Sequence, residues 1–228
     1  MPVHDKLSWT YSALWKATLP ISLSAFAIPA PQLAQFLLSA IIFHEQTAGM
    51  IVETEAYLGA DDLAAHSSRG VTPRTKVIFG PAGHAYIYLI YGMHECLNVV
   101  ADVVGIPGCV LIRALEPLAG IPLMHERRQW HGPPKGLTNG PGKLTQALAI
   151  TRAQYGVRLD RGPLTIRQWR TRPDFPIATT PRVGISQCTD WPLRFIWANH
   201  PCLSVPIRSP EKSLSRKERG FSGPSETF

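Results

Sequence analysis

Glu55 and Tyr57 stand two positions apart in residues 50–58, a run whose alternation of residue types predicts a β-strand. A period of two gives one face to the odd-numbered residues from Ile51 to Tyr57 and the other face to the even-numbered ones. A carboxylate beside an aromatic ring can activate a water molecule next to a stacked planar group. Ordinary solvent-facing strands carry the same pair, so the pair needs further support.

Arg113 interrupts Cys109–Leu115, an apolar run that predicts a strand buried on both faces. A buried guanidinium is costly unless a carboxylate pairs with it, and Glu55 or Glu53 could supply that carboxylate. An arginine beside Glu55 would keep that carboxylate ionised, as a general base requires. A purely structural ion pair would use the same residues.

Two β-prone runs, Ala85–Ile90 and Glu95–Val100, flank a short glycine-containing turn and predict a β-hairpin. Tyr86 and Tyr88 share one strand face, and Tyr91 stands at the tip. An exposed aromatic side chain at a hairpin tip is a candidate wedge between base pairs. Core packing is the alternative, and it suits Tyr86 better than Tyr91.

Two further motifs carry weaker signals. His66 lies in a predicted loop or short helix and has no second histidine at metal-ligand spacing, so no metal role is predicted. Gly140–Lys143 resembles part of a phosphate-binding loop, but Leu137 and Leu144 stand where that pattern requires Gly and Ser or Thr. A helix beginning near Lys143 could still bind a phosphate at its N-terminus.

Composition favours a polyanionic partner. Lys and Arg number 23 against 16 Asp and Glu, giving a net charge of +7 in a chain with only 17% charged residues. Nucleic acid is the first candidate and a membrane surface the second, although a basic excess also serves solubility. The four cysteines form no C-x-x-C pair, which argues against structural zinc and iron–sulfur clusters and favours a reduced, intracellular protein without cofactor.

The order of these segments predicts one α+β domain with a curved, mainly antiparallel sheet, surrounding helices and a protruding hairpin. In the apolar N-terminal stretch, prolines interrupt every run before it reaches membrane-spanning length, and Pro31 is expected to open a helix over Gln32–Phe43. Later strands are expected at 164–168, 182–185 and 193–197. Residues 1–207 are assigned to the domain, and the polar residues 208–228 to a disordered tail.

Several segments between about residues 44 and 205 together resemble the alkyladenine (3-methyladenine) DNA glycosylase family. They match that family in order along the chain. They are Val52–Gly59, Ala64–Ser67, Thr72–Arg74, Tyr86–Met93, Asn98, Val110–Pro117, Gly140–Pro141, Lys143–Leu144, Gln146–Leu148, Arg182–Gly184 and Pro192–Phe195.

The resemblance implies a role for each matching residue. Glu55 would be the general base, and Arg113 with the backbone of Val183 would orient the attacking water. Tyr91 would insert into the DNA where the nucleotide leaves. The remaining implied roles concern the base pocket and the DNA backbone. Tyr57, His66, Tyr88 and Asn98 would line the pocket, with His66 also able to donate a hydrogen bond to the base and Asn98 disfavouring guanine, while Thr72, Arg74, Met93 and Lys143 could contact the backbone.

The resemblance further implies a monofunctional hydrolase. It would flip alkylated or deaminated purines out of double-stranded DNA, leave an abasic site, and so begin base excision repair. It would work as a monomer, with the DNA inside the cell, without cofactor, metal or membrane. His94 and Glu95 depart from the bulky aromatic residues that the family often carries there, and an acidic Glu95 facing DNA would weaken binding.

Two other classes fit parts of the pattern. A nucleic-acid-binding module without activity would need Tyr91 and the basic surface, but not Glu55 together with Arg113. The motif of helix-hairpin-helix glycosylases is matched only weakly, by the turn at Gly105–Gly108. The joint presence of Glu55 and Arg113 favours the hydrolase.

Overall fold

The computed structural model describes residues 9–206, and the long strand β3 (Thr47–Tyr57) lies at its centre. One edge of β3 pairs with β6 (Cys109–Ala119), and the other pairs first with β2 (Ile41–His44) and then with β9 (Arg194–Trp197). Every pairing in the sheet is antiparallel. The other strands are β1 (Thr18–Pro20), β4 (Ala85–Ile90), β5 (His94–Val100), β7 (Leu164–Trp169) and β8 (Ile177–Thr180).

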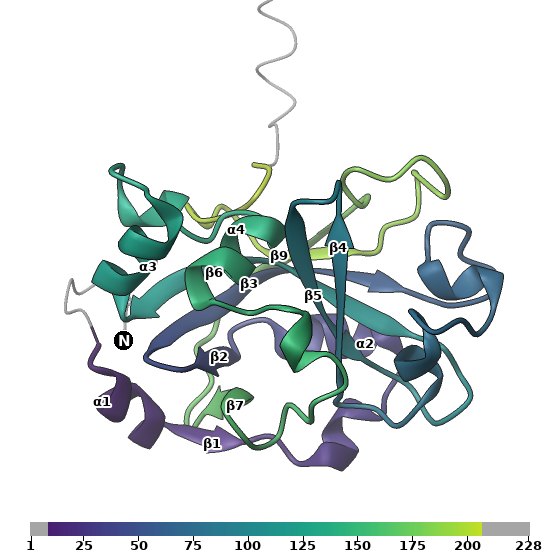
Figure 1. Ribbon diagram of the computed structural model, residues 1–228, viewed down its shortest axis with the longest axis horizontal. Helices are drawn as coiled ribbons and strands as arrows, with labels where there is room; N and C mark the ends of the chain where they lie inside the picture. The colour runs from purple at the N-terminus through teal and green to yellow at the C-terminus, as the bar shows by residue number, and fades with distance from the viewer. Residues whose placement is uncertain (1–8, 207–228) are drawn as a thin grey trace, which may run out of the picture.

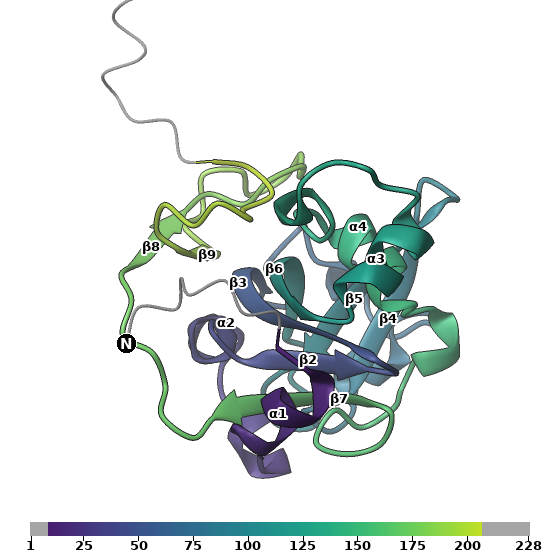
Figure 2. The same ribbon diagram turned by 90° about the vertical axis from the view of Figure 1, so that its left-hand side faces the viewer.

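The strands form a nine-stranded sheet in the order β1-β7-β2-β3-β6-β5-β4, with β8 joined through β9. Among residues 9–206, the α-helices lie around this sheet (Figures 1 and 2). The predicted α+β class with an antiparallel sheet is therefore confirmed. The helices are α1 (Tyr11–Lys16), α2 (Ala30–Leu37), α3 (Ile121–Arg128) and α4 (Pro141–Leu148), and the 3₁₀ turns are Leu23–Phe26, His66–Arg69, Lys76–Phe79, Pro134–Gly136 and Arg152–Gln154.

Apolar periodicity explains how the helices cover the sheet. In α2, Leu33 and Leu37 recur at helical spacing and are fully buried against the core that contains Ile112. Helix α4 packs on β5 and β6, and α3 packs on α4. Among residues 9–206, no helix is long and apolar enough to cross a membrane.

The helix predicted over Gln32–Phe43 was wrong in its second half. Helix α2 ends at Leu37, because Leu38 is extended and Ser39 takes a φ of 69°, which breaks helical hydrogen bonding. Phe43 lies instead in β2, which pairs with β3 and β7. Tertiary pairing of an apolar segment prevailed over its local helical pattern.

The strict alternation predicted for residues 50–58 was also wrong. The register of β3 against β6 shifts between Ile51 and Glu53 and again between Glu53 and Thr54, which marks a β-bulge. Ile51 therefore packs in the same core as Ala56, whereas the expectation placed it with Glu53. After the bulge, Glu55 and Tyr57 still share a face, as predicted, and are hydrogen-bonded to each other.

The hairpin strands and the strands at 164–168 and 193–197 are confirmed to within a residue or two. The strand predicted at 182–185 was wrong, because these residues form a loop after β8. The predicted tail at 208–228, and the domain boundary before it, lie outside the described residues.

Candidate active site

Glu55 has no solvent-exposed surface and is held by three donors. Its Oε1 accepts a hydrogen bond from the Val183 backbone N–H at 2.7 Å, and its Oε2 accepts from the Tyr57 hydroxyl at 3.0 Å. Arg113 Nη1 donates to the same Oε2 at 3.3 Å. Burial raises the pKa of Glu55, and these three donors oppose that rise by favouring the ionised form.

Arg113 binds both carboxylates that the sequence offered as alternatives. Its Nε lies 3.1 Å from Glu53 Oε1, while Nη1 reaches Glu55. Arg194 Nε donates to Glu53 at 2.8 Å, and Ser204 donates to Glu53 through its backbone N–H at 2.6 Å and its hydroxyl at 2.7 Å. Two carboxylates and two guanidiniums thus form a buried network whose formal charges cancel.

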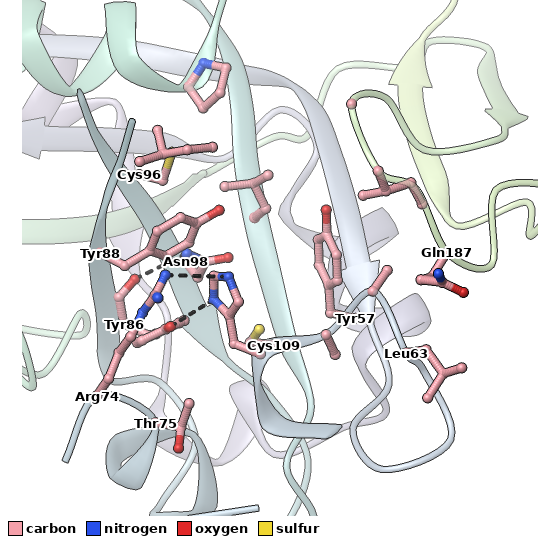
Figure 3. A pocket seen from close by; sticks show the side chains of 18 of the residues that line it. Tyr57, Leu63, Arg74, Thr75, Tyr86, Tyr88, Cys96, Asn98, Cys109 and Gln187 are labelled. Atoms are coloured by element: carbon pink, nitrogen blue, oxygen red, sulfur yellow. Dashed lines mark hydrogen bonds between the residues drawn. The ribbon is translucent and has the colours of Figure 1, made fainter. Parts of the chain in front are cut away.

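A cavity of about 670 Å³ opens beside this network. Figure 3 shows Tyr57 on one side of it and Tyr86, Tyr88 and Asn98 on the other. Among the residues that line it are the predicted Tyr57, His66, Thr72, Arg74, Tyr88, Asn98, Arg113 and Val183. The cavity therefore combines aromatic faces with a guanidinium and a backbone carbonyl.

Glu55 lies one contact behind the cavity wall. Its three donors, Tyr57, Arg113 and Val183, all line the cavity, whereas Glu55 itself does not. The Val183 carbonyl oxygen accepts from Arg113 Nη1 at 3.4 Å, so backbone and guanidinium meet beside the carboxylate. The polar end of the cavity is therefore built around a shielded anion.

Both ring nitrogens of His66 already have protein partners. Arg74 Nη2 donates to Nε2 at 3.3 Å, and Nδ1 lies 2.8 Å from the Tyr86 hydroxyl. Since arginine only donates, Nε2 accepts, and the neutral ring donates to Tyr86 through Nδ1. Burial lowers the pKa of His66, and the charges of Arg74 and Arg69 lower it further. A hydrogen bond from this ring to a base requires one of the two contacts to break.

The strand pair β4–β5 fixes the tyrosine wall. Tyr88 packs edge-on to His66 with ring centroids 4.6 Å apart, and Tyr86 is almost fully buried beneath it. Asn98 lies opposite Tyr86 in the register, and its Nδ2 donates to the Tyr86 carbonyl at 3.2 Å. The sequence assigned Tyr86 to the core, and the structure shows that it also orients His66.

Tyr91 and Met93 lie at the tip of the hairpin, away from the cavity wall. Their side chains are 81% and 74% exposed, and the turn points outward at the upper end of the molecule in Figure 1. Tyr91 and Gly92 both take positive φ, at 52° and 69°, which makes the turn tight. The hairpin thus presents two exposed apolar side chains beyond the sheet.

The Glu95 carboxylate is paired with an arginine rather than free in solvent. Its Oε1 accepts from Arg152 Nε at 3.0 Å, and the side chain is mostly buried. His94 packs against Gly142 at the start of α4, where an added Cβ would lie 2.8 Å from the His94 Cβ. Lys143 is exposed on the same helix and donates to Asn139 at 3.0 Å. The departures at 94 and 95 therefore tie the hairpin to its neighbours.

Sequence reasoning missed Arg182, Asp62 and Arg194. Arg182 and Asp62 form a fully buried ion pair, and the Arg182 guanidinium lies 4.6 Å from the centroid of the Tyr57 ring. The argument used for Arg113 applies equally to Arg194, which starts an apolar strand, and would have predicted a carboxylate partner for it. Arg182 gave no such signal, because it follows Pro181 at the start of a short mixed run and does not interrupt an apolar strand. Among residues 9–206, no cluster of three His, Cys, Asp or Glu side chains is placed to hold a metal ion.

Comparison with known proteins identifies the scaffold around this cavity. The model of the methylpurine-DNA glycosylase family matches residues 24–201. The chain belongs to the methylpurine-DNA glycosylase family. It is accordingly a DNA glycosylase, a hydrolase of N-glycosyl bonds that acts on DNA in repair. The family predicted from the motifs is confirmed, and the match begins well before residue 44, where the first motif was placed.

Curated relatives agree with the family match. A protein of Methanoculleus marisnigri is 51% identical over 71% of this chain and 86% of its own length. One of Chlorobaculum tepidum is 43% identical over 84% of this chain and 94% of its own. A third, of Myxococcus xanthus, is 44% identical over 74% and 83%. Each carries the name "Putative 3-methyladenine DNA glycosylase".

Proposed function

We propose that this glycosylase removes damaged purines from double-stranded DNA after rotating the nucleotide into the aromatic cavity. Residues 1–207 would form the catalytic domain, with the working core at about 44–205, acting as a monomer. The names of the relatives support N3-alkylated adenine as one substrate, and we extend the class to other alkylated and deaminated purines. Release of the base leaves an abasic site, which begins base excision repair.

The aromatic walls are suited to a planar base. Tyr57 would stack on one face of the extruded purine, and Tyr88 with His66 would contact the other. Asn98, whose amide is fixed by the backbone of Tyr86, would face the purine edge and disfavour the exocyclic amine of guanine. Extrusion leaves a gap in the duplex, and Tyr91 at the exposed hairpin tip would fill it.

Backbone phosphates would be bound around the mouth of the cavity. Thr72 and Arg74 line the cavity and are exposed, while Met93 and Lys143 lie on the hairpin tip and the first turn of α4. Hydroxyl and cationic side chains are the usual partners of phosphate oxygens. Glu95 does not oppose this binding, because Arg152 neutralises it.

The observation that carries the proposal is the buried Glu55 carboxylate between Arg113 and Val183. A water held by the Arg113 guanidinium and the Val183 carbonyl would attack C1′ of the sugar. As the new C–O bond forms, the C1′–N bond breaks and its electron pair leaves with the base. Once the water has entered between Arg113 and Val183, it passes a proton to the Glu55 carboxylate behind them, and the negative charge of Glu55 also stabilises the oxocarbenium-like transition state.

Substitution Glu55→Gln tests the assignment. We expect single-turnover base release from an alkylated duplex to fall by about 10²–10⁴-fold, because the amide can neither accept the proton nor supply the charge. Affinity for the same duplex should persist, because the aromatic walls remain. Glu126→Gln, at an exposed position of α3, is the matched control and should release base at the wild-type rate. Retained turnover in Glu55→Gln would refute the role of Glu55.

A further inference from the structure

Arg74 is an exposed residue whose guanidinium nevertheless lies against the tyrosine wall of the cavity. Its guanidinium carbon lies 5.0 Å from the centroid of the Tyr88 ring, and its Nη2 donates to His66. Figure 3 shows its side chain reaching toward Tyr86 and Tyr88. The backbone is fixed as well, because the Tyr155 hydroxyl donates to the Arg74 carbonyl at 3.1 Å.

The charge of Arg74 is not balanced within the cavity. The buried carboxylates of Glu53 and Glu55 are offset by Arg113 and Arg194. Within the part of the chain that the structure describes, no carboxylate lies within salt-bridge distance of Arg74. His66 adds no charge of its own, because its lowered pKa keeps the ring neutral near pH 7. The wall around Tyr88 therefore carries the uncompensated positive charge of Arg74.

This positive wall distinguishes two kinds of damaged purine. A purine alkylated at N3 or N7 is a cation while it is attached to the sugar, whereas a deaminated purine such as hypoxanthine is neutral. A cation is attracted to the face of a tyrosine ring, but Arg74 already uses the ring of Tyr88 in this way. A second positive charge near the same ring is repelled, and the repulsion grows as the entering base displaces water from between the two charges.

We propose that Arg74 is a specificity-determining residue that favours neutral damaged purines over cationic ones. This inference rests on the proposed function, since it concerns the base that the same cavity accepts. Arg74 would act through its charge from its place beside Tyr88. Removal of that charge should therefore raise the rate of release of a cationic base relative to the rate for a neutral base.

The test compares Arg74→Gln with the wild type on duplexes that contain one hypoxanthine or one 7-methylguanine. Glutamine keeps an N–H donor for His66 but carries no charge. We expect the ratio of the single-turnover rates, 7-methylguanine over hypoxanthine, to rise about tenfold. Arg74→Lys keeps the charge and should keep the wild-type ratio. Arg161→Gln removes the same charge at an exposed position outside the cavity wall and should also keep it.

The outcomes separate this inference from the proposed function. An unchanged ratio in Arg74→Gln, with base release by the wild type intact, overturns the role of Arg74 alone. Failure of the wild type to release hypoxanthine, 7-methylguanine and 3-methyladenine alike overturns both. A second measurement is independent of turnover. Titration of the His66 ring by NMR in the free protein should show a higher pKa in Arg74→Gln, and an unchanged pKa would contradict the placement of the guanidinium.

Discussion

Burial and hydrogen bonding act in opposite directions on the Glu55 carboxyl. Burial dominates and raises its pKa, so the ionised form that a general base needs is the form that folding disfavours. Base release should accordingly decline on acidification at a higher pH than for an ordinary exposed glutamate. A group whose folded pKa exceeds its unfolded pKa costs stability above the folded pKa, and this cost disappears as the pH falls through that value.

Glu55→Gln should therefore stabilise the fold while it removes activity. Glutamine is neutral like the protonated carboxyl, so we expect the free energy of unfolding at pH 7 to rise by roughly 0.5–2 kcal/mol, the size of a typical single stabilising substitution. Chemical denaturation of both proteins measures the difference. At acidic pH the difference should vanish, since wild-type Glu55 is then protonated.

Glu53→Gln provides a control of opposite sign in the same strand. Glu53 accepts from Arg113, Arg194 and both donors of Ser204, so its loss leaves the buried Arg194 without a carboxylate partner and Arg113 with Glu55 alone. We expect a loss of roughly 3 kcal/mol. Equal destabilisation by the two substitutions would show that Glu55 is a structural ion rather than a disfavoured base.

At the scale of single residues, the sequence could predict that Arg113 needs a buried carboxylate, because an unpaired guanidinium in an apolar strand is costly. It could not choose between Glu53 and Glu55. Perfect alternation would put both on one face, so the pattern could not distinguish them, and the structure places both within reach of Arg113. The Ser204 contact was equally beyond reach, because it joins residues 151 positions apart.

The β4–β5 hairpin is the element that the sequence described best, because its strands are adjacent in the chain and its turn is short. Pairing runs from Ala85 with Val99 to Ile90 with His94, and one face of β4 carries Tyr86 and Tyr88 into the cavity. The same rigid element thus holds the tyrosine wall at its base and Tyr91 at its tip. Wall and tip are fixed relative to each other by the cross-strand hydrogen bonds.

Tyr91→Ala should lower the affinity for a lesion duplex about tenfold or more, because one aromatic stacking contact with bases contributes roughly 1–3 kcal/mol. Fluorescence anisotropy with lesion-containing and undamaged duplexes measures this effect, and the undamaged duplex should change less. Val104→Ala truncates another exposed apolar side chain, at the loop between β5 and β6, and should leave both affinities unchanged. Equal affinity of Tyr91→Ala and wild type would count against the wedge.

Longer-range pairing explains the errors at the level of elements. Residues 41–44 look helical in isolation but complete a sheet between β3 and β7. The loop at 182–185 looks like a strand, yet Val183 must turn its N–H toward Glu55 and its carbonyl toward Arg113. Backbone N–H and carbonyl groups that are hydrogen-bonded to side chains are not available to pair with a neighbouring strand.

Over the whole molecule, arginine rather than lysine carries the positive charge near the cavity. The lysines of residues 9–206 are Lys16, Lys76, Lys135 and Lys143, and none of them lines the cavity. A lyase mechanism needs an amine that can attack the sugar and form a Schiff base. The arrangement therefore supports water as the nucleophile and a monofunctional reaction.

Borohydride should consequently trap no covalent adduct between this glycosylase and a lesion duplex during turnover. Denaturing electrophoresis of the reaction detects such an adduct by its reduced mobility, and a bifunctional glycosylase in the same buffer serves as the positive control. A trapped species in the glycosylase lane would overturn hydrolysis by water.

The order of the site residues along the chain has a consequence for biosynthesis. Glu55 and the tyrosines emerge from the ribosome early, whereas Val183, Arg194 and Ser204, which lock the two carboxylates in place, are among the last of the described residues to be made. A nascent polypeptide can thus form most of the sheet while its anionic centre stays open and misaligned. On the proposed mechanism, the capacity to release a base is acquired only when the segment through residue 205 has been translated and has docked.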